Sequence, residues 1–195
     1  NFFKNTSLEA QIASISDDIA YNSHDLEDGL KSNLFNLNDL NDIPILNKII
    51  MKHKKKLIKY SIDLVVRQVI REIINEMVGD VIKTTKKNIE LNKIKNLNDV
   101  YNFKKKVVSF SKKMSVFDFK IKTFLKRKMY FHKSVKIKTD YGKKIIRNLF
   151  FKIKKNPKKY INIDKYNNLN LERIISDYIA GMTDRYAINL YNKIK

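Results

Sequence analysis

Five side chains near the start of the chain have types and a spacing that could do chemistry. Asp17, Tyr21 and Asp25 recur at every fourth residue, so in a helix they stack on one face. At about 100° per residue, His24 and Asp28 fall on that face as well. Carboxylate and imidazole groups bind metals or carry protons, and a phenol ring can line a pocket. The pattern predicts a metal or substrate site on this face.

A solvent-exposed acidic face is the alternative interpretation of the same pattern. Two observations weigh against it. Lysine is abundant elsewhere but absent between Asn5 and Leu30, where a solvent-facing surface of this chain would be expected to carry it. The face also includes Tyr21, and tyrosine rings are usually covered. On the pattern alone, the two interpretations are about equally supported. The opposite face, expected to be buried, carries Leu8, Ile12, Ile15, Ile19, Leu26 and Leu30.

The elements that would position this face are helical. The chain has only 4 Gly and 2 Pro, so few turns interrupt it and an all-α fold is expected. A capping box formed by Thr6 and Glu9 predicts the start of a first helix that runs to about Leu34. Polar breaks are expected at 36–42 and 96–99, a new helix start at Pro44, and a β-prone stretch without a firm assignment at 107–110. Further helices are expected at about 57–91 with a break or bend at Gly79, at 112–132, at 134–155 with an interruption near Gly142, and at 171–194.

The composition excludes several classes of protein. There is no Cys, so disulfides and thiolate metal sites are ruled out. No apolar run has the length of a membrane span and no signal peptide is recognisable, so a cytoplasmic protein without a membrane partner is expected. His53 stands in a basic run without ligand neighbours, which predicts a surface residue.

The formal charge of +21, from 41 basic and 20 acidic residues, has two explanations. One is a polyanionic partner such as a nucleic acid, which basic runs with aromatic neighbours can bind. The other is the composition of an AT-rich genome, because Lys far outnumbers Arg and the chain is rich in Asn and Ile. We place compositional drift first and keep a nucleic-acid-binding or assembly module as the rival function. Its basic runs are Lys52–Lys56, Lys104–Lys106, Lys152–Lys155 and Lys158–Lys159.

Three blocks of sequence resemble a known enzyme family in the same order. Ser7–Gln11 with Ser16–Gly29, Phe124–Val135 and Asp177–Ala187 are similar to segments of the dGTPase-like deoxynucleoside-triphosphate triphosphohydrolases of the HD superfamily. The resemblance covers nearly the whole chain and implies the C-terminal part of a multi-helix HD-type domain. In that comparison, residues 1–35 end the metal-site core and residues 43–195 form a helical C-terminal region. Because the chain begins at Asn1 rather than Met, a fragment is expected.

The resemblance implies a role for five residues. Asp17 corresponds to the last ligand of a divalent metal such as Mg²⁺ or Mn²⁺, with Asp18 as a supporting group. Tyr21, Asp25 and Tyr130 correspond to residues around the deoxyribose, and Lys122 could face the triphosphate. For Lys122, and for His132, a purely structural role is the more ordinary interpretation.

The implied reaction is hydrolysis of a deoxynucleoside triphosphate to deoxynucleoside and inorganic triphosphate. The family's upstream His and His-Asp metal ligands are absent, and the His24-Asp25 pair does not replace them. One carboxylate does not hold a catalytic metal, so the chain alone is expected to be inactive. The family also implies a homo-oligomer, in which the block Asp177–Ala187 could serve subunit packing.

Overall fold

The structure is a computed structural model that describes residues 4–54, 60–162 and 170–194. All regular secondary structure in these residues is helical, which confirms the predicted all-α fold. The chain divides into two compact units, Asn1–His132 and Lys133–Lys195. Within the described part, no helix combines the length and the apolar character needed to cross a bilayer.

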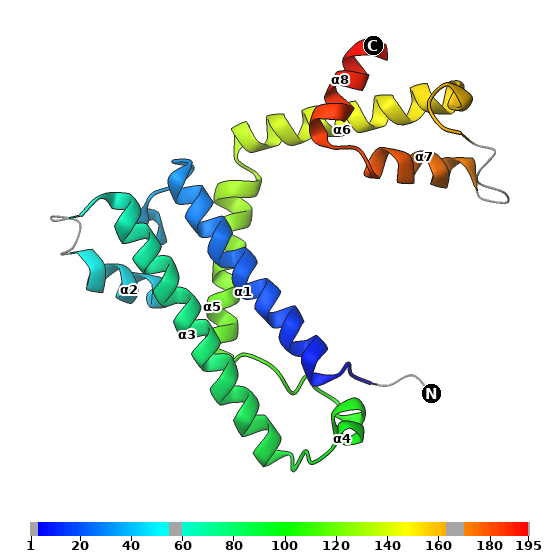
Figure 1. Cartoon of the computed structure of the whole chain (residues 1–195). Helices are drawn as coiled ribbons and strands as arrows, with labels where there is room; N and C mark the ends of the chain where they lie inside the picture. The colour runs from blue at the N-terminus through cyan, green and yellow to red at the C-terminus, as the bar shows by residue number, and fades with distance from the viewer. Residues whose placement is uncertain (1–3, 55–59, 163–169, 195) are drawn as a thin grey trace. The chain divides into compact units, whose positions relative to one another are not determined.

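The first unit is built around two long helices. α1 (Leu8–Lys31) packs against α3 (Ile62–Leu91) and also against α5 (Lys112–Leu125), while α2 (Pro44–Lys54) covers another part of α3 (Figure 1). A 3-10 turn, η1 (Leu37–Leu40), links α1 to α2, and α4 (Leu97–Asn102) follows α3. α5 continues into η3 (Lys126–Tyr130), a turn of π-helix in which the amide of Phe131 donates to the carbonyl of Lys126.

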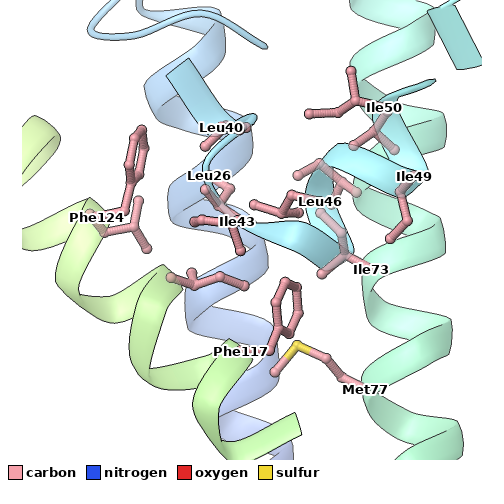
Figure 2. Close-up of a cluster of buried hydrophobic side chains, with 14 of the residues drawn as sticks. Leu26, Leu40, Ile43, Leu46, Ile49, Ile50, Ile73, Met77, Phe117 and Phe124 are labelled. Carbon is pink, nitrogen blue, oxygen red and sulfur yellow. The ribbon is translucent and has the colours of Figure 1, made fainter. Parts of the chain in front are cut away.

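The core of this unit forms where α1, α2, α3 and α5 meet. Leu26, Leu46, Ile73 and Phe117 point into a common interior in Figure 2, and each is 2 % exposed or less. Burial of large aliphatic and aromatic side chains contributes about 1.5–3 kcal/mol each. This interior holds α1 in place, so that its opposite face remains open.

The second unit packs two short helices against one long amphipathic helix. α6 (Lys133–Lys155) contacts α7 (Leu171–Ala180) and α8 (Asp184–Ile194), and a short turn, η4 (Pro157–Lys159), follows it. The buried residues of α6 recur every fourth position and meet residues of the other two helices. They are Ile145, Leu149 and Ile153 from α6, with Ile174, Ile175 and Tyr191.

Several predicted boundaries were wrong. The N-cap of α1 is Ser7, whose hydroxyl accepts from the amide of Ala10, and the helix ends at Lys31. Gly79 and Gly142 lie inside unbroken helices because a glycine costs a helix only about 1 kcal/mol. The expected final helix is two helices, separated at 181–183. Residues Leu57–Lys59 of the helix expected at about 57–91 lie outside the described residues.

Three further expectations need correction. The polar stretches at 36–42 and 96–99 include helical turns, since Asn36 and Asn96 each form a capping box with the aspartate three residues on. The stretch 107–110 is irregular in the structure, with Val107 and Val108 buried. Ile12, expected on the buried face, is 49 % exposed, because its neighbour Gln11 takes the inward position at this turn and accepts from the amides of Val107 and Val108.

Candidate functional site

The polar face of α1 is presented as the sequence predicts. Ser7 caps the helix, and Ile19, Leu26 and Leu30 are buried on the opposite side. Asp17, Tyr21, His24 and Asp28 are exposed and Asp25 is half-buried. The face is therefore accessible to a ligand, and α5 and η3 supply the neighbouring side chains.

Tyr130 of η3 reaches Asp25 of α1, although 105 residues separate them in the sequence. The phenol donates a hydrogen bond to the Asp25 carboxylate. Burial raises the pKa of Tyr130 to about 12, and the hydrogen bond to Asp25 and the negative charge of Asp25 act in the same direction. Tyr130 is therefore a neutral donor near neutral pH. Tyr21, Asp25 and Tyr130 form one group.

Lys122 of α5 also faces α1. Its Nζ lies 3.3 Å from Asp18 Oδ1 and 3.0 Å from Asp118 Oδ2. Burial lowers the pKa of Lys122, but the hydrogen bond and charge of Asp118, together with Asp18, outweigh it and leave the pKa raised. The lysine is thus charged and held between two carboxylates.

Asn22 and Asp118 join the two helices and were missed by the sequence analysis. The Asn22 amide donates to Asp118 Oδ1 over 2.7 Å, and Asn22 is only 5 % exposed. A polar residue on the buried side of α1 was the available signal for Asn22. For Asp118, the signal was its position one turn before Lys122, where an i,i+4 ion pair forms.

The metal-ligand expectation rests on Asp17 alone. Asp17 is exposed on α1, and among residues 4–54, 60–162 and 170–194 no group of three or more His, Cys, Asp or Glu side chains could hold a metal ion. Hard divalent cations need several oxygen ligands. Asp17 therefore fits one position of such a site, and these residues do not form the site by themselves.

His53 and His132 lie outside α1. His53, expected at the surface, is only 5 % exposed, and its Nε2 lies 2.5 Å from Glu72 Oε2. The prediction was wrong because Glu72, from α3, supplies a partner that the basic run around His53 does not suggest. His132 is half-buried at the end of the first unit.

Known proteins similar in sequence to this chain carry phosphohydrolase names. A family model described as a phosphohydrolase-associated domain matches residues 108–193. A deoxyguanosinetriphosphate triphosphohydrolase-like protein of Pelagibacter ubique is 49 % identical over 190 residues, which are 97 % of this chain and 51 % of that protein. Proteins of the same name from Leptospira interrogans and Rickettsia typhi are 36 % and 34 % identical over 96 % of this chain.

This chain is a homologue of the deoxyguanosinetriphosphate triphosphohydrolase-like proteins. These relatives are named as triphosphohydrolase-like proteins, and the matched domain is described as phosphohydrolase-associated. It spans about half the length of the relatives that it matches. The matched domain begins shortly before α5, which carries Asp118 and Lys122, and includes Tyr130.

Proposed function

We propose that this chain is part of an enzyme that hydrolyses deoxynucleoside triphosphates to deoxynucleosides and inorganic triphosphate. Water would attack the α-phosphorus, the bond from phosphorus to the 5′-oxygen would break, and the leaving 5′-oxygen would take up a proton. We assign that proton transfer to no described residue. The other residues of the active site would come from the half of the relatives' length that this chain does not span.

The observation that carries the proposal is the group of Tyr21, Asp25 and Tyr130. A carboxylate beside two phenol groups suits a sugar, because Asp25 can accept from a sugar hydroxyl and the rings can pack against its carbon face. A ring placed against the 2′-carbon would also exclude a 2′-hydroxyl by crowding. This arrangement supports a deoxynucleotide as substrate.

Lys122 and Asp17 would serve the phosphate end of the substrate. Lys122 is a charged donor beside α1, and charged donors stabilise the negative charge that develops on phosphate. Asp17 would supply one oxygen ligand to Mg²⁺ or Mn²⁺, which when bound polarises the α-phosphate. The chain described here would be inactive alone.

The test uses the complete protein, with the reading frame upstream of Asn1 included. We expect it to release inorganic triphosphate from a deoxynucleoside triphosphate in the presence of Mg²⁺ or Mn²⁺, and to lose this activity in Asp17→Asn. Glu90→Gln is the matched control, because Glu90 is an exposed carboxylate near the end of α3. An active Asp17→Asn variant would remove Asp17 from the metal site, and an inactive complete protein would overturn the proposed reaction.

A binding module without catalysis is the second candidate, and one observation favours it. A hollow of about 610 Å³ near the end of α3 is lined by Lys104, Lys105 and Lys106 together with asparagines. Asn88 donates to Val107 O over 2.8 Å and so fixes the neighbouring loop. Three lysines at one hollow could bind the phosphates of a single-stranded nucleic acid. If the complete protein binds single-stranded nucleic acid but does not hydrolyse deoxynucleoside triphosphates, this candidate is favoured.

A further inference from the structure

Lys122 has two carboxylate partners that differ in how firmly they are held. The side chain of Asp118 is 14 % exposed, and its second oxygen is occupied by the amide of Asn22 at 2.7 Å. The side chain of Asp18 is 53 % exposed and lies farther from Nζ, at 3.3 Å against 3.0 Å. An exposed ion pair is weak and easily exchanged, whereas a partly buried carboxylate with a second hydrogen bond is fixed. Asp118 is therefore the anchor and Asp18 the exchangeable partner.

The anchor lies at the contact between the two helices that carry the candidate site. Asn22 follows Tyr21 directly on α1, and Asp118 precedes Lys122 by one turn on α5. The hydrogen bond between Asn22 and Asp118 thus relates the position of Lys122 to that of the α1 polar face. A lysine side chain otherwise has many rotamers, and ordering it costs up to about 2 kcal/mol.

The ammonium group of Lys122 has donors to spare. It has three N–H donors and accepts no hydrogen bond. One donor is committed to Asp118, and a second goes to Asp18 at the exposed side. An anion that displaces Asp18 can take this second donor and the third, while Asp118 keeps the group in place.

We propose that Asp118, fixed by Asn22, is a positioning residue that holds the Lys122 ammonium toward the polar face of α1, where the triphosphate of the substrate would bind, with Asp18 as the partner that the phosphate replaces. The inference rests on the proposed function. In this inference, Asn22 and Asp118 act on the substrate only through Lys122. They affect binding of the phosphates and not of the sugar.

The test compares inhibition of the complete protein by its two products. In Asp118→Asn, which keeps the shape and still accepts from Asn22, we expect KM for the deoxynucleoside triphosphate and Ki for inorganic triphosphate to rise by about tenfold, since hydrogen bonds to charged groups are worth that much. Ki for the deoxynucleoside should change little, because Asp118 acts on the phosphates only. Lys122→Met should have the same pattern, and Asp118→Asn should add nothing further in that background.

The outcomes separate positioning of Lys122 from a general structural role of Asp118. Equal rises in Ki for both products would indicate a general structural role and overturn the inference, as would a lower KM, which would mean that the Asp118 charge only repels substrate. Additive effects of Asp118→Asn and Lys122→Met would also overturn it. If Asp118→Asn does not fold, Asp118→Glu keeps the charge but moves it by one methylene, and the same rise in Ki for triphosphate alone is expected. A wild-type protein without triphosphate release would instead overturn the proposed function itself.

Discussion

The hydroxyl of Tyr130 contacts the Asp25 carboxylate across the candidate site. In the second helix of the site, Lys122 is used in a similar way, as a donor to carboxylates that come from α1 and α5. In both cases a donor from the later part of the chain faces an acid on α1. At the scale of single residues, the candidate site is a set of donors on α5 and η3 paired with acceptors on α1 and α5.

Removal of the Tyr130 hydroxyl tests this pairing. In the complete protein, we expect Tyr130→Phe to lower kcat/KM by about tenfold, because a hydrogen bond to a charged group is lost while the ring remains. Absorbance titration supplies an independent measurement. The pKa values of Tyr130 and Tyr178 are both raised to about 12, so two tyrosines of the wild type should ionise above the usual value of 10.0, and only one should do so in Tyr130→Phe. An unchanged titration curve would contradict the contact.

Glu72 gives a prediction about pH and stability. Hydrogen bonds from Lys52 and then His53 lower the pKa of Glu72 below 4.5, against the effect of burial. A lowered carboxylate pKa stabilises the fold above pH 4.5, and this contribution is lost as the pH falls below 4.5 toward the folded-state pKa. We expect Glu72→Gln to cost about 1–2 kcal/mol at pH 7 and much less at pH 3.5, measured by urea unfolding. Equal losses at both pH values, or an equal effect of the exposed control Glu90→Gln, would contradict this interpretation.

Part of the site could be predicted at this scale and part could not. The face of α1 with Asp17, Tyr21 and Asp25 follows from a period of 3.6 residues, which the sequence displays directly. Lys122 and Tyr130 came from a resemblance, and nothing in their own segment indicates α1 as the neighbour. Asn22, Asp118 and the Glu72 partner of His53 were not predicted, because such pairings depend on which helices pack together.

Among the elements, α1 must approach the turn that follows it very closely at Gly29. A Cβ atom at Gly29 would overlap the ring of Phe35, which is buried and packs edge-on against Phe124 at 4.8 Å between ring centroids. Gly79, in the middle of α3, would have nothing within 4 Å of an added Cβ. The two glycines thus differ in packing although both lie in helices.

This difference predicts opposite effects of the same substitution. Gly29→Ala should destabilise the protein by about 1–3 kcal/mol through overpacking. Gly79→Ala should stabilise it by about 0.5–1 kcal/mol, because alanine loses less backbone entropy in a helix. Thermal and denaturant unfolding of both variants would measure the difference. Stabilisation by Gly29→Ala would show that Phe35 moves aside freely, contrary to the packing described.

Element boundaries were harder to predict than the elements. The long helices α3 and α6 were expected from their apolar periods, but the breaks placed at Gly79 and Gly142 were wrong, since packing of α3 and α6 offsets the low helix propensity of one glycine. The π-helical turn at Lys126–Tyr130 was not predicted. A π-helical turn has no strong signature in the local sequence. This turn ends at Tyr130, whose hydroxyl contacts Asp25.

The charge of the whole molecule is a property that single sites do not describe. With a net charge of +21, the protein should bind any polyanion at low salt. If composition is the main cause, we expect binding to a single-stranded DNA to be independent of sequence and to fall steeply as salt rises. Fluorescence anisotropy between 50 and 200 mM salt would measure this binding. Over that interval, a protein with several phosphate contacts loses about 10³–10⁵ in affinity.

A matched pair of variants would localise that binding. Replacement of Lys104, Lys105 and Lys106 by Gln removes three charges at the 610 Å³ hollow, and replacement of Lys136, Lys138 and Lys144, which are exposed on α6, removes the same number elsewhere. Equal losses of affinity are expected from charge alone. A much larger loss in the first variant would favour the binding-module function.

The contacts between α1 and the later helices also determine when this fold can form during synthesis. Gln11 is buried and accepts from the amides of Val107 and Val108, Asn22 pairs with Asp118, and Tyr130 pairs with Asp25, so each partner is about a hundred residues away. Contacts between distant residues form slowly because the intervening loop must first close. As the chain leaves the ribosome, α1 can pack against α3 first, and the side of the core that α5 covers stays open until α5 has emerged. During that interval we expect the open apolar side of the core to be prone to aggregation.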